Sequence, residues 1–127
     1  MRHFVQYHNP EVMSRPYTPS HKNFGIVTDK FFRSLVGATV WLVTSEGRPR
    51  HYYLCSTFTV DKVERDNAGR FRNRVSGSVG QDLDPFVEIG EMPWFPELLK
   101  VTGNFGLGLQ PISNKAIIQG FEKAASS

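Results

Sequence analysis

The sequence lacks the features that mark secreted, membrane-bound and disulfide-stabilised proteins. It has a single cysteine, Cys55, so no disulfide can form within the chain, and a lone thiol is typical of a reducing compartment. No run approaches the roughly 20 apolar residues of a membrane span. Residues 1–8 are too polar for a signal peptide. We therefore expect a cytoplasmic protein with no membrane partner.

Motifs for metal binding and nucleophilic catalysis are missing as well. The sequence contains neither Cys-x-x-Cys nor His-Glu-x-x-His. His51 and Cys55 share one strand face, but four residues along a strand span roughly 13 Å, too far for a shared ion or for a nucleophile and its base. The glycines at 103, 106 and 108 lack the Gly-Lys-Ser/Thr of a phosphate loop. We expect no metal site and no cofactor.

What the sequence does contain is the pattern of one small mixed domain. Its 127 residues fit a single domain, 1–127, which can remove roughly two-thirds of its unfolded surface from water. Alternating and β-branched segments predict the strands, with a bulge or bend expected at Gly77 and Gly80. The predicted strands are 3–7, 24–28, 38–44, 51–63 and 70–79.

Short helices are predicted between and after these strands. Asn9 and Asp29 are placed as N-caps, the second for a helix that runs to about Leu35. Residues 83–92 are predicted to be an acidic connection and residues 93–100 a helix. Ser113 is the predicted cap of a last helix, whose apolar stripe is Ile117, Phe121 and Ala124.

This order predicts an α+β fold. Long antiparallel segments bracketed by short helices favour a small, curved, mixed or antiparallel β-barrel-like sheet with short helices packed over its ends.

Charge is unevenly distributed along the chain. The net charge is only +3, but residues 48–74 are rich in arginine, whereas residues 82–97 contain five acidic and no basic residues. Alternate strand positions lie about 6.6–7 Å apart, comparable to the phosphate spacing of a nucleic acid strand. The alternative is an exposed face that charge keeps soluble, or one that pairs with the acidic segment. The candidate phosphate-binding residues are Arg48, Arg50, Arg70, Arg72 and Arg74.

Three segments resemble the PUA-like superfamily, especially its EVE, YTH and ASCH branches. The first is Phe4-Val5-Gln6-Tyr7-His8-Asn9-Pro10. The second is Phe24-Gly25-Ile26-Val27-Thr28-Asp29-Lys30 with Val36-Gly37-Ala38-Thr39-Val40-Trp41-Leu42-Val43. The third is Asn104-Phe105-Gly106-Leu107-Gly108-Leu109-Gln110-Pro111-Ile112-Ser113. The resemblance implies a PUA-like fold that recognises a modified or flipped base.

By this resemblance, the base-binding pocket lies between the exit of the first strand and the second strand. Aromatic faces in such a pocket return roughly 1–3 kcal/mol per stacked base, which offsets the few kcal/mol needed to extrude it. Most of the ten phenylalanines, four tyrosines and two tryptophans must still form the core. The candidate pocket residues are Tyr7, His8, Asn9, Phe24, Thr28 and Trp41, with Trp94 or Phe105 as a lid.

Two other functions stay open. Some ASCH-like proteins are small hydrolases with a pocket lysine and threonine, which implies a catalytic role for Lys30, Thr28 and Asp29 towards nucleic acid or a nucleoside. The competing interpretation is a helix start capped by Asp29. The acidic segment 82–97 also suits a protein partner in a nucleic-acid-processing assembly. We favour the non-enzymatic module, with DNA or RNA as its partner.

Overall fold

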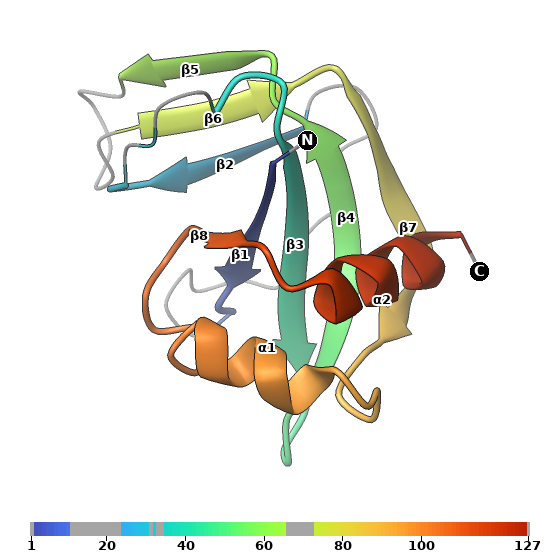
Figure 1. Cartoon of the computed structure of the whole chain (residues 1–127). Coiled ribbons are helices and arrows are strands. Elements are labelled where there is room, and N and C mark those ends of the chain that lie inside the picture. The colour runs from blue at the N-terminus through green and yellow to red at the C-terminus, as the bar shows by residue number, and fades with distance from the viewer. Residues whose placement is uncertain (1, 11–23, 31, 33–34, 66–72, 127) are drawn as a thin grey trace.

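The computed structural model describes residues 2–10, 24–30, 32, 35–65 and 73–126. Across these residues the chain is α+β, mostly strands in two sheets with two short helices (Figure 1). None of the described helices is long and apolar enough to cross a membrane. In chain order the elements are β1 (His3–His8), β2 (Phe24–Thr28), β3 (Thr39–Glu46), β4 (His51–Thr59), β5 (Lys62–Arg65), β6 (Asn73–Gly77), β7 (Val79–Glu88), α1 (Phe95–Val101), β8 (Gln110–Ile112) and α2 (Lys115–Ala125).

The larger sheet has five strands in the order β7-β4-β3-β1-β8. β1 pairs in parallel with β3, which brings His3 opposite Thr39 and Tyr7 opposite Val43. All other neighbours in this sheet are antiparallel. The first strand therefore lies inside the sheet, between β3 and the last strand of the chain.

The smaller sheet has the order β2-β6-β5. The predicted strands 51–63 and 70–79 are wrong as single strands, because the chain passes between the sheets after Thr59 and again at Ser78. The two crossings are tied together, since the Ser78 backbone N–H and hydroxyl both donate to one oxygen of Asp61, at 2.7 and 2.8 Å. These hydrogen bonds lower the pKa of Asp61. The expected bend near Gly77 is therefore a change of sheet.

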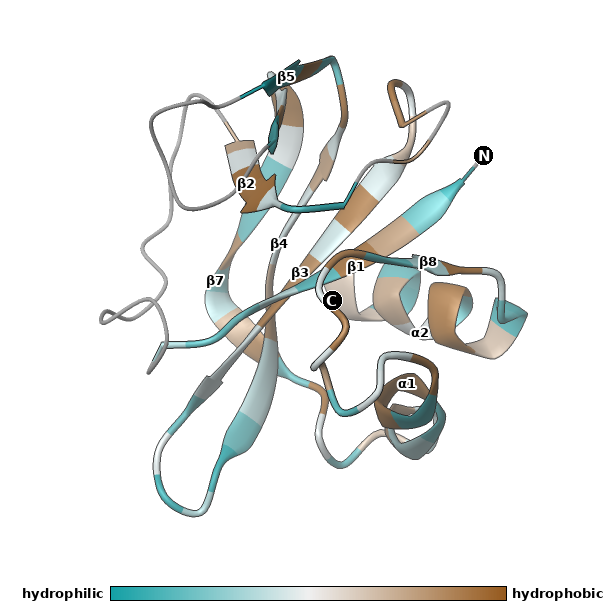
Figure 2. Ribbon diagram, turned by 90° about the vertical axis from the view of Figure 1, so that its left-hand side faces the viewer, coloured by the Kyte–Doolittle hydropathy of each residue, from teal (hydrophilic) through white to brown (hydrophobic). Residues whose placement is uncertain are grey.

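Hydrophobic side chains form two clusters on opposite faces of the larger sheet. One contains Phe4, Val40 and Val75 and joins the two sheets. The other joins the larger sheet to the helices. Figure 2 shows α1 and α2 on one side of this sheet and β2 and β5 on the other. The backbone hydrogen bonds between strands divide the described strands into two separate sheets, and these sheets are not joined into a closed barrel.

The predicted helix from Asp29 to Leu35 is wrong for the part that is described. Residues 29, 30, 32 and 35 have no helical backbone. The Thr28 hydroxyl accepts a hydrogen bond from the Lys30 backbone N–H. This N–H is therefore satisfied by the residue before Asp29, the predicted cap, and not within a helix. Pro10 lies in a turn, and the rest of the helix predicted after Asn9 lies outside the described residues.

The acidic segment 83–92 is also corrected, because β7 runs through most of it. Acidic residues and proline disfavour a central strand, but β7 is at the edge of its sheet, where both are tolerated. The predicted helix 93–100 is present as α1, shifted by one to two residues. The cap of α2 is Asn114 rather than Ser113: its side chain accepts from the Ile117 N–H. The predicted stripe on α2 is confirmed as buried.

Candidate ligand-binding groove

The predicted pocket residues are distributed over several parts of the molecule. Tyr7 and Phe105 stack at 4.8 Å between ring centroids, and Tyr52 and Phe95 complete a group of four rings. The Tyr7 hydroxyl is hydrogen-bonded to Ser45. We call these four residues the tyrosine cluster. Its rings contact one another and α1, so they fill this end of the sheet.

The other predicted aromatic residues lie elsewhere. Trp41 and Trp94 both contact Phe121 of α2, at 5.2 and 5.1 Å. Phe24 belongs to the core between the two sheets, where it stacks on Phe58. Thr28 is buried at the end of β2.

His8 and Asn9 are half-buried at the exit of β1, and the His8 carbonyl accepts a hydrogen bond from Thr44. The structure thus does not bring the eight predicted pocket residues together.

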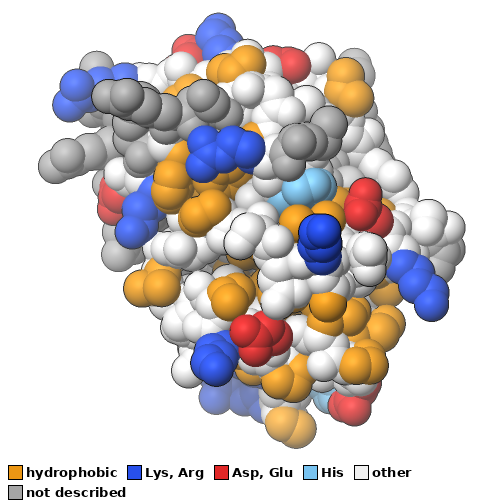
Figure 3. Space-filling view, viewed as in Figure 1, with side chains coloured by type: hydrophobic (Ala, Val, Ile, Leu, Met, Phe, Trp, Pro, Cys, Tyr) orange, Lys and Arg blue, Asp and Glu red, His pale blue; other side chains and the backbone are white. Residues whose placement is uncertain are grey.

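The predicted arginines are also dispersed. Arg48 and Arg50 lie in the turn between β3 and β4, whereas Arg74 is exposed on β6 of the smaller sheet. Arg70 and Arg72 lie outside the described residues. On the face seen in Figure 3, blue and red side chains are interspersed among the coloured residues and do not gather by sign.

The candidate catalytic residues lie at the end of β2, which holds Thr28, and directly after it, where Asp29 and Lys30 follow. Asp29 and Lys30 are exposed, and the Lys30 carbonyl accepts from Asn73 at 3.1 Å. The Thr28 hydroxyl is already an acceptor for the Lys30 N–H.

An open groove lies at the opposite end of the sheet from the tyrosine cluster, with a volume of about 500 Å³. Most of its floor is formed by side chains that share the helix-side face of four neighbouring strands, β1, β3, β4 and β7. Phe58, whose ring packs between the two sheets, and Gly80 line the groove as well. Its wall is the last turn of α2. The threonines Thr39, Thr57 and Thr59 have short side chains, so the middle of the floor is deeper than its borders, where larger residues stand. The lining residues are His3, Thr39, Trp41, Thr57, Phe58, Thr59, Val79, Gly80, Gln81, Glu122, Ala125 and Ser126.

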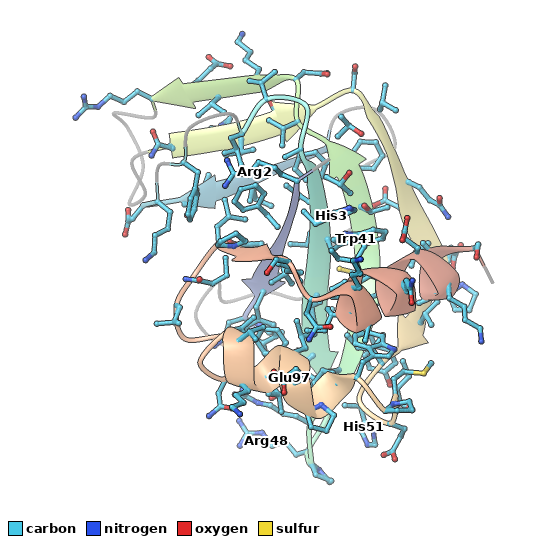
Figure 4. The ribbon with its side chains drawn as sticks, viewed as in Figure 1. Arg2, His3, Trp41, Arg48, His51 and Glu97 are labelled. Carbon is cyan, nitrogen blue, oxygen red and sulfur yellow. The ribbon has the colours of Figure 1, made fainter. Side chains whose placement is uncertain are left out.

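One hydrogen bond organises the groove. The Trp41 indole Nε1–H donates to His3 Nδ1 at 3.0 Å, and the two rings are within 11° of parallel. Because a ring N–H and a ring lone pair both lie in the ring plane, this bond and the 6.1 Å between the ring centroids place the rings edge to edge. Figure 4 labels the two side chains. Trp41 is 4% exposed, with Phe121 stacked on it at 5.2 Å. The half-buried His3 continues the indole surface into the groove.

The same bond fixes the protonation state of His3. An indole N–H can only donate, so Nδ1 must be the unprotonated nitrogen and Nε2 carries the hydrogen. A second proton on Nδ1 would remove the acceptor from Trp41. Burial lowers the pKa of His3, and the nearby Glu122 carboxylate opposes that effect. His3 is therefore held as a neutral ring with one N–H donor.

Sequence reasoning identified Trp41 but missed the other groove residues. His3 has no neighbour in sequence that marks it, because its partner lies on another strand and depends on the β1–β3 register. A signal was available in β4, where Thr57 and Thr59 alternate with the buried Ser56 and Phe58. Such alternation predicts a polar face opposite a buried one.

Within the described residues, no group of three or more histidine, cysteine, aspartate or glutamate side chains could hold a metal ion. Compared with known proteins, the chain matches no family model, no curated protein and no solved structure.

Proposed function

We propose that this chain is a nucleic-acid-binding module that takes one base into the groove and stacks it on His3. The observation that carries the proposal is the edge-to-edge pair of His3 and Trp41, which extends an aromatic plane from the core into an open groove. Every base has a π-face, so a rigid ring at the border of a groove is a platform for stacking.

Size and energy support this assignment. A volume of about 500 Å³ falls within the range of small-ligand sites, roughly 300–1,000 Å³. Stacking returns roughly 1–3 kcal/mol per base, enough to offset much of the cost of unstacking a base from a single strand. Trp41 was among the predicted pocket residues, whereas the proposed platform itself is His3.

The phosphate contacts form the second part of the proposal. Arginine is the side chain best suited to phosphate, and each contact releases counterions and steepens the salt dependence. The net charge of +3 favours a polyanion over a neutral partner. Arg48 and Arg50 lie at the far end of the sheet from the groove and Arg74 lies on the smaller sheet, so in this proposal they would contact phosphates distant from the bound base. Arg70 and Arg72 belong to the part of the chain that the structure does not describe.

The family assignment stays part of the proposal. We infer kinship with the PUA-like superfamily from the three sequence segments that resemble it, and with it a curved, barrel-like relation of the two sheets and a cytoplasmic location. A reader of modified bases is the function that this kinship implies.

Binding of labelled single-stranded DNA and RNA, measured by fluorescence anisotropy over a salt series, tests the proposal. We expect His3→Ala to weaken binding about ten-fold, the loss of about 1.4 kcal/mol of stacking. His51→Ala is the matched control, because His51 is an exposed histidine at the far end of the sheet, bound to Glu88 at 2.9 Å (Figure 4).

Unfolding midpoints of both variants check that the fold is retained. Equal affinities of the wild-type protein and His3→Ala, or no binding of any oligonucleotide, would overturn the proposal. Equal affinity for modified and unmodified oligonucleotides would remove the modified-base reader alone.

A further inference from the structure

Several hydrogen-bond donors of the groove are already used inside the protein. Trp41 donates to His3, Thr57 to the Val40 carbonyl and Gln81 Nε2 to the Ala125 carbonyl. The Ser126 hydroxyl likewise donates to a carbonyl of its own helix. The groups left for a ligand include the Nε2–H of His3 as a donor and the Gln81 side-chain oxygen as an acceptor.

Glu122 is the strongest acceptor among the lining residues. It is exposed on the last turn of α2, directly after the Phe121 ring that covers Trp41. Among the described residues, its carboxylate makes no hydrogen bond or ion pair. His3 and Glu122 both line the groove, and the Glu122 charge opposes the effect of burial, which lowers the pKa of His3. A ring stacked on His3 would therefore share the groove with this carboxylate.

We propose that Glu122 selects guanine as the base taken into the groove, a specificity that rests on the stacking function proposed above. A carboxylate offers two acceptor oxygens and no donor. Guanine carries two adjacent donors on one edge, its ring N1–H and its exocyclic amino group, and these match the two oxygens of a bidentate pair.

The other bases match this carboxylate less well. Adenine and cytosine place an unprotonated ring nitrogen beside their amino group, so a lone pair would face the second carboxylate oxygen. Uracil and thymine carry one ring N–H between two carbonyls, which repel the carboxylate on both sides.

The experiment compares guanine with hypoxanthine, which differs from guanine by the missing amino group. Two otherwise identical oligonucleotides carry a single guanosine or a single inosine within a run of uridines. We expect the wild-type protein to bind the guanosine oligonucleotide about ten-fold more tightly, in line with the lower part of the range for a bidentate contact. Glu122→Gln should abolish this difference and favour adenosine, because glutamine pairs one donor and one acceptor with adenine.

Glu97→Gln is the matched control, an exposed glutamate on α1 that lies away from His3 and Trp41 in Figure 4. It should retain the preference for guanosine. If binding depends on His3 but the wild-type protein does not distinguish guanosine from inosine, or Glu122→Gln still does, the guanine inference is overturned and the stacking function stands. If no oligonucleotide binds in a way that depends on His3, the stacking function itself fails.

Discussion

The helix-side face of the larger sheet carries rings at both ends, yet one end is filled and the other is open. At the tyrosine cluster, Tyr7, Tyr52, Phe95 and Phe105 pack against one another beneath α1. At the groove, α2 covers Trp41 through Phe121 and leaves His3 at the border. Both ends use the strands β1, β3 and β4. The difference comes from what stands beside the rings.

In the tyrosine cluster, Phe95 and Phe105 pack against Tyr7 and Tyr52, whose partners across the strands are only Val43 and Ser45. Beside His3 stand the paired threonines Thr39 and Thr59. Short polar side chains leave space above a sheet that rings would occupy. An aromatic residue therefore becomes a candidate ligand contact through what packs above it and its neighbours on the sheet, and its own identity says little. The following variants test this contrast, from the largest expected effect to the smallest.

Phe121→Ala should have the largest effect, because it removes the ring that holds α2 over Trp41. Phe121 is fully buried, and the loss of a buried phenylalanine ring costs about 3–5 kcal/mol through lost burial and the cavity left behind. Chemical denaturation measures the change in the free energy of unfolding. The exposed Lys123→Ala on the same helix should change it by less than about 0.5 kcal/mol. A loss below 1 kcal/mol for Phe121→Ala would show that α2 does not depend on this contact.

Gly120→Ala should destabilise the protein although it lies in a helix. Alanine is about 1 kcal/mol better than glycine in an open helix, but a Cβ at this position would run into the Trp94 indole. Displacing that ring costs about 1–3 kcal/mol, typical of an overpacked site. Denaturation of Gly120→Ala and of the neighbouring exposed variant Gln119→Ala gives the comparison. Equal or greater stability for Gly120→Ala would mean that Trp94 moves aside freely.

Tyr7→Phe probes the filled end. It keeps the ring and removes the hydroxyl that is hydrogen-bonded to the buried Ser45, so we expect a loss of about 0.5–1.5 kcal/mol in stability. Oligonucleotide affinity, measured by anisotropy, should not change. A weakened affinity with an intact fold would show that the ligand binds at the tyrosine cluster and not in the groove.

The pH dependence of stability should show the smallest effect. Burial lowers the pKa of His3 in the folded protein, so below the ordinary histidine value of about 6.5 the unfolded state binds more protons. Stability is therefore greatest above that pH and falls as the pH drops through the folded pKa. Unfolding free energies of the wild type and His3→Gln between pH 8 and pH 5, a range chosen to span about 6.5, should diverge in slope. Parallel curves would contradict the Trp41–His3 arrangement.

Much of the fold follows from local sequence. The period-two pattern of 24–28 predicts β2 with its bounds, and the stripe of Ile117, Phe121 and Ala124 predicts the buried face of α2. The division into two sheets does not follow, because the alternation of 51–63 continues through the point where the chain leaves one sheet for the other. β7 was missed because the cost of acidic residues in a strand depends on whether the strand is at an edge, which only the topology decides.

The groove was harder to predict than the fold. Trp41 could be nominated, since it lies in one of the segments that resemble the PUA-like superfamily. His3 could not, because the imidazole gains its role from a bond to an indole on a parallel neighbouring strand. Glu122 looks like any exposed charge on a terminal helix until α2 is packed against the sheet. Both residues depend on tertiary pairing rather than on local pattern.

The inside position of β1 has a consequence for synthesis and assembly of the protein. Its partners are β3 and β8, and the groove joins a side chain near the start of the sequence to one near its end. A nascent chain on the ribosome keeps one border of β1 unpaired until Ile112 has emerged, and it has no groove until α2 has docked. Any molecule held between His3 and Glu122 would thus fasten the first strand to the last helix, raising the melting temperature as its concentration rises.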